Sequence, residues 1–562
     1  MGKKRKKHGP EAVPAAPPPP AAAKPPRAWL RGIKYAIYSL IPVTVLLALG
    51  ETGARFIPGD LQSKHAFYVA GGHEEYFGTQ KLYVPYRVLP PYYWLPVPHT
   101  PITNNRGFRG HDWSEAKPAG TVRIACLGDS CTLGGQEPYA QRLERLLGEA
   151  LGNRKYEVLN AGVGSSSTYQ MIQILEQYVL PMRPDLVVVF PGWNDRWVHD
   201  GQRDSLHQLP TEAQQDLRNR LMKSRLFKAL AYYADEWRRR HKEQRVPPAE
   251  SRENLRKIAR LCRQNGVQAW FCTVPSGCTE AGIRSRFAED RPRNWDNDLY
   301  DIYRDKGNGP VEVWDYISKL YADVIANASR DEDVPVIDLV GWMRERAAVY
   351  TDPALHFFKD GIHFSELGLQ EVARRIAVSL MSGGEADALN RYLDSVKYFM
   401  ANAPVFMSQF QFAAADDFLN RAVAAGESPD GEVARLRGHI VQERPFYDLY
   451  DSARMELSNG GEPAKALELF QQCLAMRPDE QNVRLDAADQ AKGIGRFQLS
   501  LDLALGQKAN YTPQNLNRAL WIAVEAANRL GRQDLVQQIL MEIAERFPND
   551  ARIQRILQAS DR

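Results

Sequence analysis

The sequence predicts an α/β protein built on a doubly wound parallel sheet, with an N-terminal transmembrane helix and a C-terminal all-α domain of helical repeats. An uncharged apolar run lies at 35–50, apolar strand-like runs alternate with amphipathic segments in 121–385, and Ala/Leu/Gln-rich helical segments fill 386–562. Strands that alternate with helices are typical of parallel sheets covered on both faces. The chain has 562 residues. This length leaves room for roughly three to four domains.

The N-terminal segments predict a tail and a membrane anchor. Residues 1–31 are basic and rich in Pro and Ala, so they cannot bury enough apolar surface to fold and are expected to be a disordered cytoplasmic tail. The segment 32–54 contains the uncharged run from Tyr35 to Gly50 and is predicted to be a transmembrane helix. Basic residues before this run place the N-terminus in the cytoplasm and the body outside the inner membrane, in the periplasm. A cleaved signal peptide is the alternative.

Charge and cysteine content exclude two classes of protein. The net charge is +4, and the basic N-terminus carries more than this, so the remainder is mildly acidic and no nucleic-acid partner is expected. Six cysteines are too few for a disulfide-built scaffold in a chain of this length. Cys272 and Cys278 could pair in an oxidising compartment, and free buried thiols are the alternative.

The segment 55–120 is rich in Pro, Tyr and Gly. Proline at this density excludes long helices. We expect an extended lead-in that packs on the next domain, and its sequence indicates no function.

The segment 121–385 is predicted to contain the sheet. The expected strands cover 121–128, 156–162, 184–192, 266–276 and 334–340, and the expected helices cover 138–151, 168–180 and 366–381. The third strand is a continuous Val/Phe run of the kind that parallel sheets bury on both faces. The long segment between Trp197 and Asn265 is expected to form either a cap over the site or a solvated surface helix.

Polar residues follow the expected strands at the edge where parallel sheets carry their working residues. "GDS", ending at Ser130, follows the first strand, and "NAGVGSSST" belongs to the second. "GWND", with Asn194, follows the third, and "DGIH", with Asp360 and His363, precedes the last helix. Each motif alone is typical of a turn. Four of them at one sheet edge indicate a site.

These residue types fit nucleophilic catalysis on an acyl group. A serine hydroxyl such as that of Ser130 becomes a nucleophile when a base removes its proton, and His363 is the candidate base. Asp360, three residues earlier, is the candidate that orients the ring and stabilises the imidazolium. Negative charge on the carbonyl oxygen needs preset donors. The candidate donors are the Ser130 amide, an amide of Gly164–Ser165 and the Asn194 side chain.

At these motifs the sequence resembles the SGNH (GDSL) hydrolase family over about 121–385. The apolar segment and "NNRGFRG" are similar to its membrane-anchored bacterial branch. The resemblance implies a flavodoxin-like sheet, the serine, histidine and aspartate roles given above, and esterase or acyl-transfer chemistry without a metal or cofactor. One position departs from the family. The oxyanion glycine normally lies five residues after the Asn of the second block, where this chain has Ser165, and Gly164 comes one residue earlier. A serine would be strained there if the site needs a positive φ.

The segment 386–562 is predicted to form tetratricopeptide-like repeats. Prolines recur at a spacing of 35, and glycines recur at nearly the same spacing: Pro478, Pro513, Pro548, Gly461, Gly495 and Gly531. The usual repeat period is about 34, and such arrays present a concave surface. This pattern predicts a protein-binding arm. The alternative is an all-helical domain that packs on the sheet domain and stabilises it.

The expected activity is hydrolysis of O-acyl esters, with an envelope glycan as a substrate inferred from the location alone. O-acyl transfer uses the same acyl-enzyme and differs only in whether water or a sugar hydroxyl accepts the acyl group. A non-catalytic scaffold that works through its repeats is the alternative from another class. The complete set of Ser130, Asp360 and His363 argues against it.

Overall fold

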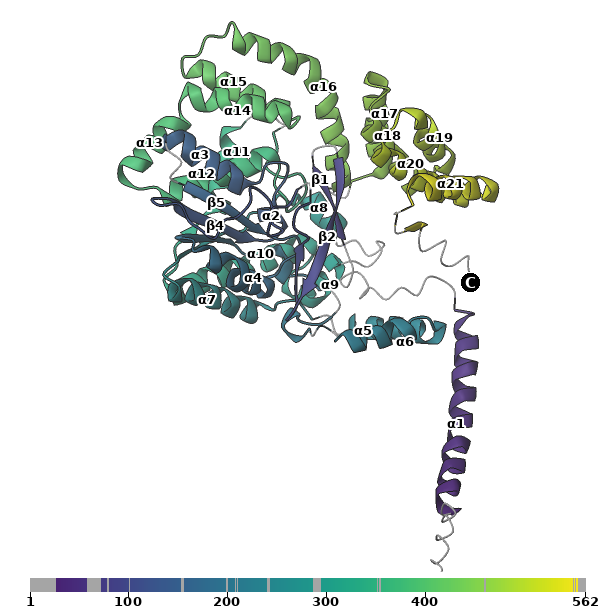
Figure 1. Ribbon diagram of the computed structural model, residues 1–562. Helices are drawn as coiled ribbons and strands as arrows, with labels where there is room; N and C mark the ends of the chain where they lie inside the picture. Colours follow the sequence, from purple (N-terminus) through teal and green to yellow (C-terminus); the bar gives the residue numbers. More distant parts are fainter. Residues whose placement is uncertain are drawn as a thin grey trace, which may run out of the picture. The chain divides into compact units, whose positions relative to one another are not determined.

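The computed structural model describes residues 27–57, 72–77, 80–100, 102–152, 156–198, 201–207, 209, 211–239, 243–286, 295–350, 352, 355–458, 461–548, 550 and 552–553 (Figure 1). The tail predicted over 1–31 lies mostly outside these residues. The chain divides into two compact units, Met1–Ser63 with Glu212–Tyr233, and Lys64–Thr211 with Ala234–Arg562.

The first unit contains α1 (Arg27–Ala54), α5 (Glu212–Leu221) and the start of α6 (Arg225–Arg239). The Glu51 carboxylate of α1 accepts hydrogen bonds from the Ser224 hydroxyl at 2.7 Å and from the N–H groups of Arg225 and Leu226 at 3.0 and 2.9 Å. A carboxylate at this position satisfies N–H groups that have no partner within the helix. The end of α1 is thereby fixed to the start of α6.

We expected a transmembrane helix over 32–54. Within the described residues, no helix is both long enough and apolar enough to cross a membrane.

The lead-in contains a small sheet that the sequence analysis did not foresee. Strands β1 (Gly72–Phe77), β2 (Gln80–Leu89) and β3 (Tyr93–Pro96) pair antiparallel in this order. All four residues of β3 are buried, and Trp94 is among those that join the core beneath the central sheet. The lead-in therefore packs on the domain that follows it.

The central sheet is parallel, as predicted. Its strands are β4 (Val122–Gly128), β5 (Tyr156–Gly162), β6 (Leu186–Phe190), β7 (Gln268–Cys272) and β8 (Val336–Ile337). The order is β5-β4-β6-β7-β8, and every neighbouring pair is parallel. The order reverses at β4, so the carboxyl ends of β4 and β6 form the switch point where such sheets bind ligands.

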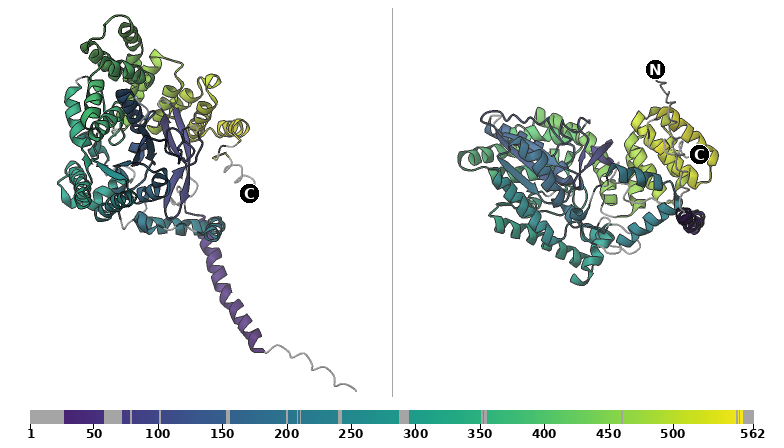
Figure 2. Two further views of the ribbon diagram at one scale, coloured as in Figure 1. Left: turned by 60° about the vertical axis from the view of Figure 1, so that its left-hand side comes forward. Right: turned by 60° about the horizontal axis from the view of Figure 1, so that its bottom comes forward.

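Helices cover both faces of this sheet (Figures 1 and 2). Alternate residues of β4 enter different cores, with Ile124 and Cys126 in one and Ala125 and Leu127 in the other, because strand side chains alternate between faces. The first core includes α3 (Tyr139–Leu151) and α12 (Glu366–Leu380), and the second includes α4 (Thr168–Ile174) and α7 (Pro248–Gln264). Helix α10 (Pro310–Glu332) contributes to both cores.

Two differences from the expected elements are local. The helix expected over 168–180 is α-helical only to Ile174 and continues as a π-helical turn, Leu175–Val179. The last strand is shorter than 334–340, because Leu339 already begins a helix. The remaining helices of this region are α2 (Ser130–Leu133), α8 (Glu280–Arg286), α9 (Trp295–Tyr303) and α11 (Leu339–Val349).

A large helical region follows the sheet domain. Its helices are α13 (Gly383–Leu393), α14 (Val396–Ser408), α15 (Phe412–Ala424), α16 (Glu432–Ser458), α17 (Pro463–Met476), α18 (Gln481–Gly493), α19 (Phe497–Leu505), α20 (Pro513–Arg529) and α21 (Gln533–Arg546). Gly495 and Gly531 both adopt positive φ, 79° and 73°, at corresponding positions after α18 and α20. The tetratricopeptide-like assignment itself stays a prediction.

The hydrophobic core continues across the boundary predicted at 385/386. One core cluster runs from α3 and α12 through α13 to α18, and the buried residues of α19 to α21 belong to a second cluster, to which α18 also contributes. The fully buried Arg142 of α3 adds polar contacts, donating to Gln370 at 3.2 Å, to Gln409 at 3.0 Å and to Glu366. The first part of the helical region therefore supports α12, which begins three residues after His363.

Candidate active site

Ser130 lies where β4 turns directly into the short helix α2. Gly128 has no room for a side chain, because a Cβ there would lie 2.0 Å from Oγ1 of Thr132. Asp129 caps α2, and its carboxylate accepts a hydrogen bond from the N–H of Cys131 at 2.9 Å. The Gly-Asp-Ser sequence thus places the partly exposed Ser130 at the carboxyl end of the central strand.

Asp360 and His363 lie in a tight loop before α12. Oδ1 of Asp360 accepts hydrogen bonds from the N–H groups of Ile362 and His363 at 2.8 and 2.7 Å. The loop is closed by the N–H of Lys359, which donates to the carbonyl of His363 at 2.9 Å. The second oxygen, Oδ2 of Asp360, lies 2.7 Å from Nδ1 of His363.

The third contact joins this loop to the serine, since Nε2 of His363 lies 2.9 Å from Oγ of Ser130. Burial raises the pKa of Asp360, but the His363 ring and the N–H donors outweigh burial and hold this pKa well below its usual range. An ionised Asp360 accepts the Nδ1–H of His363, which leaves the Nε2 lone pair to accept the Ser130 hydroxyl. The structure therefore brings the three predicted residues into one hydrogen-bonded relay. Ser130 and His363 are in direct contact although they lie 233 positions apart along the chain.

Neighbouring residues hold the two loops together. The Cys131 thiol donates to the carbonyl of Ile362 at 3.4 Å, and the N–H of Gly277 donates to the carbonyl of Gly361 at 3.0 Å. Burial raises the pKa of the Cys131 thiol well above its usual value, so this cysteine stays protonated. The Cys272–Cys278 pairing considered from the sequence is not formed, since both are free cysteines.

Asp129 joins the first and third motifs, a role that the sequence analysis did not assign. Its side chain is fully buried, and Oδ2 accepts hydrogen bonds from the N–H of Trp193 at 3.0 Å and from Nδ2 of Asn194 at 3.3 Å. Burial raises the pKa of this carboxyl group, and its hydrogen bonds act in the opposite direction. The only signal in the sequence was an acidic residue between the glycine and the serine.

Asn194 is buried beside this carboxylate. Its Nδ2 also donates to the carbonyl of Ser166, at 3.1 Å. Both amide hydrogens therefore have acceptors within the protein. The oxyanion role predicted for Asn194 stays a prediction. It requires Nδ2 to release one of its two contacts, and the contact to Asp129, at 3.3 Å, is the longer of the two.

Ser165 adopts the left-handed conformation, with φ of 60°. It occupies the third position of a turn in which the N–H of Ser166 donates to the carbonyl of Val163 at 3.1 Å. A non-glycine residue in this conformation costs roughly 1–2 kcal/mol. The strain expected from the departure at Ser165 is thus present. In the described part of the chain, the N–H groups of Ser130 and Ser165 donate to no other residue.

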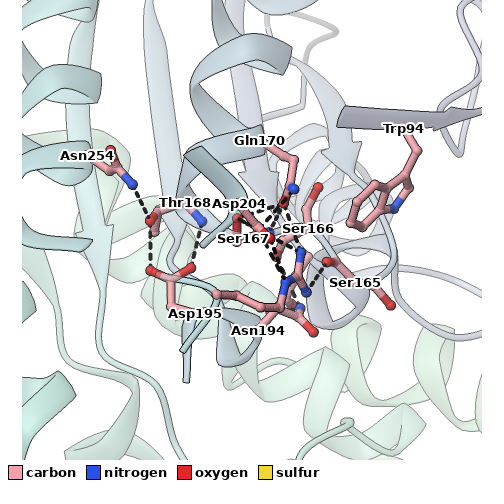
Figure 3. Close-up of polar contacts among 12 residues, drawn as sticks. Trp94, Ser165, Ser166, Ser167, Thr168, Gln170, Asn194, Asp195, Asp204 and Asn254 are labelled. Carbon is pink, nitrogen blue, oxygen red and sulfur yellow. Dashed lines mark hydrogen bonds and ion pairs between the residues drawn. The ribbon is translucent and has the colours of Figure 1, made fainter. Parts of the chain in front are cut away.

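A buried polar network lies beneath this turn (Figure 3). Asp204 accepts hydrogen bonds from the Ser167 hydroxyl at 2.7 Å, from Gln170 at 3.0 Å and from Arg245 at 2.9 Å. Arg245 ends a strongly charged stretch of sequence, yet it is only 4% exposed. The sequence analysis missed both Arg245 and Asp204, because neither belongs to a recognisable motif.

Asp195 forms a second part of the network. Its carboxylate accepts hydrogen bonds from the N–H and hydroxyl of Thr168, both at 2.7 Å, and from the hydroxyl of Ser251 at 2.6 Å. These contacts join the start of α4 to the start of α7. Burial raises the pKa of Asp195 to about 6 against the opposing effect of these hydrogen bonds.

This pKa predicts a pH-dependent contribution to stability. The folded protein holds the Asp195 proton more tightly than the unfolded chain does, so the free energy of unfolding falls as pH rises. The fall occurs between about pH 4 and pH 6 and amounts to about 3 kcal/mol for a shift of about two pH units. In the Asp195→Asn variant the side chain at this position has no group that titrates in this pH range. Urea unfolding at pH 4, 5, 6 and 7 should therefore show the wild type losing this amount relative to the variant, and a difference that stays constant with pH would contradict the prediction.

The segment that builds the site matches a known family. Residues 126–370 match the model of the GDSL-like Lipase/Acylhydrolase family. This match supports a GDSL/SGNH hydrolase domain, and with it ester hydrolysis at the level of the family. No curated protein matches the chain. Among the described residues, no group of three or more His, Cys, Asp or Glu side chains is arranged to hold a metal ion.

Three of the solved structures that are similar to this chain each cover less than half of it. An acetyl xylan esterase, AlAXEase, is 16% identical, covers 46% of this chain and 100% of its own, and has a TM-score of 0.29. A lipase/acylhydrolase from Enterococcus faecalis is 20% identical over 46% and 95% of the two chains, with a TM-score of 0.28. Axe2, an acetylxylan esterase from Geobacillus stearothermophilus, is 16% identical over 47% and 95%, with a TM-score of 0.29.

Proposed function

We propose that this chain is a serine esterase that hydrolyses O-acyl esters, with Ser130 as nucleophile, His363 as general base and Asp360 as the residue that orients His363. The observation that carries the proposal is the relay from Oγ of Ser130 to Nε2 of His363 at 2.9 Å and from Nδ1 of His363 to Oδ2 of Asp360 at 2.7 Å. Nucleophile, base and orienting carboxylate within hydrogen-bond reach are the signature of an activated serine.

The reaction follows from this geometry. As Oγ of Ser130 attacks the ester carbonyl carbon, Nε2 of His363 takes the hydroxyl proton, and Asp360 stabilises the imidazolium. The proton then passes from His363 to the oxygen of the leaving alcohol as the ester C–O bond breaks. Water attacks the acyl-enzyme with His363 again acting as base. This second step releases the carboxylic acid and restores Ser130.

The negative charge that develops on the carbonyl oxygen needs donors beside Ser130. The N–H groups of Ser130 and Ser165, which donate to no other described residue, lie at the carboxyl ends of the adjacent strands β4 and β5. Removing one such donor raises the barrier by roughly 3–4 kcal/mol. These donors, with Asn194 as a third candidate, complete the proposed catalytic set.

The proposal is tested on the full-length protein with a fluorophosphonate and with p-nitrophenyl acetate. We expect one equivalent of phosphonate on Ser130, located by mass spectrometry of the peptide, together with hydrolysis of the acetate ester that the phosphonate abolishes. Ser130→Ala should accept no label. Labelling at another serine, or acetate hydrolysis that persists in a fully labelled protein, would refute the assignment.

We further propose that α1 attaches the enzyme to the inner membrane, with the esterase domain outside the cytoplasm. Basic residues precede the apolar part of α1, and its apolar side chains are half or more exposed: Leu40, Ile41, Val43, Leu46 and Leu49. Esters of envelope polysaccharides are the substrates within reach at that location. An alkaline phosphatase fused after residue 60 should be active, and an inactive fusion that is expressed at the same level would contradict this location.

A further inference from the structure

Three consecutive carbonyl groups of the turn at Ser165 are each held by a side chain from elsewhere in the chain. Nε1 of Trp94 donates to the carbonyl of Gly164 at 2.8 Å, and Nη1 of Arg245 donates to that of Ser165 at 2.9 Å. Nδ2 of Asn194 donates to the carbonyl of Ser166 at 3.1 Å. The three donors come from the lead-in sheet, from the segment before α7 and from the third motif.

These contacts fix the direction of one N–H group. In a trans peptide, the carbonyl of one residue and the N–H of the next point in opposite directions. Because the Gly164 carbonyl points to Trp94, the N–H of Ser165 points away from Trp94. Arg245 holds the next carbonyl, that of Ser165 itself. The peptide groups on both sides of Ser165 are thus held while this residue adopts a φ of 60°. A strained backbone conformation persists only where its surroundings fix it in this way.

The residues that hold the turn are themselves fixed. Trp94 and Arg245 are 5% and 4% exposed, and the Arg245 guanidinium lies over the Trp94 ring at 5.4 Å. Arg245 also forms a buried ion pair with Asp204 at 2.9 Å and donates to Gln170 at 3.1 Å. Figure 3 shows Trp94 and Ser165 beside the polar network that includes Asp204 and Gln170.

We propose that Trp94 and Arg245 are positioning residues that hold the Ser165 N–H as an oxyanion donor for the proposed ester hydrolysis. This inference rests on the proposed function and deepens it in two ways. It selects the amide of Ser165 over that of Gly164, and it assigns a task in catalysis to the proline-rich lead-in. A glycine reaches positive φ without strain. This chain has a serine there and holds it with two side chains.

Trp94→Phe is the sharpest test, because it removes one N–H donor while it keeps an aromatic ring in place and leaves no buried charge unpaired. We expect kcat for p-nitrophenyl acetate to fall about tenfold, less than the loss of a complete oxyanion donor. KM should change less than twofold. Inhibition by a trifluoromethyl ketone, whose adduct with a serine carries an oxyanion, should weaken by the same factor as kcat.

Trp113→Phe is the matched control. Trp113 is similarly buried, at 3%, and stacks on Phe108 in the same lead-in. The Trp113→Phe substitution should lower thermal stability about as much as Trp94→Phe does and leave kcat unchanged. Equal losses of kcat in the two variants would mean that Trp94 acts only through stability, which would overturn the proposal.

A second substitution tests the same idea through the backbone. Ser165→Gly keeps the backbone N–H group and adopts the required φ freely. In the double variant with Trp94→Phe, it should restore at least half of the lost activity on a logarithmic scale. No restoration would overturn the proposal. A wild-type protein without esterase activity would instead refute the proposed function, so the two failures are distinguishable.

Discussion

His363→Ala is expected to lower kcat/KM for ester hydrolysis by about 10⁴-fold or more, because Ser130 then has no base to take its proton. Ser130→Ala should cause a loss of similar size. The double variant should be no less active than either single variant, since both side chains act in one proton transfer. This non-additivity follows from the 2.9 Å contact between Oγ of Ser130 and Nε2 of His363.

The measurement is kcat/KM on p-nitrophenyl acetate for the three variants, with thermal unfolding to show that each is folded. His363 is 29% exposed, so its removal leaves no large buried cavity. His111→Ala is the matched control, because His111 is 42% exposed and contacts Glu157 rather than the relay. A double variant much less active than both single variants would show that the two residues act independently.

Much of the sheet domain could be predicted because its signals are local. The third strand is a continuous run of Val and Phe, and β6 is buried along its whole length. The motifs at Ser130, Asn194 and His363 each lie directly at the end of an apolar run or before a helix. Parallel topology then brings their strand ends to one edge. Sequence patterns over about ten residues are sufficient for this reasoning.

The positioning residues could not be predicted in this way. Trp94 lies in a proline-rich segment and Arg245 in a charged one, and neither context distinguishes a buried side chain from an exposed one. Their contacts with Gly164 and Ser165 join positions 70 and 80 residues apart. Contacts of this kind are set by tertiary structure, which local periodicity does not report.

The helical region shows a similar limit. Regular Pro and Gly spacing predicts pairs of helices, but it does not indicate which surface they cover. The fully buried Arg142 and its contact with Gln409 show that the start of this region supports the helix after His363. The buried residues of α19 to α21 belong to a second core cluster, to which α18 also contributes.

Asp129→Ala is expected to lower the free energy of unfolding by about 3–5 kcal/mol, because it leaves buried donors without an acceptor. The N–H groups of Cys131 and Trp193 and the side chain of Asn194 all donate to this carboxylate. The value of kcat/KM should also fall about 100-fold, since the helix that carries Ser130 loses its N-cap and the N–H of Trp193 loses the acceptor that joins it to the Ser130 turn.

Comparison with Asp129→Asn separates these contributions. An asparagine side chain keeps one oxygen, which in one orientation still accepts from Trp193 and Asn194, while its NH₂ group faces the N–H of Cys131. We therefore expect a smaller loss of stability and of activity than for alanine. Asp305→Ala, which removes a 70% exposed carboxylate, is the control and should change neither. Urea unfolding and ester kinetics on the three variants measure both effects. If Asp129→Ala were as stable as Asp305→Ala, the buried carboxylate could not be what joins the nucleophile turn to the third motif.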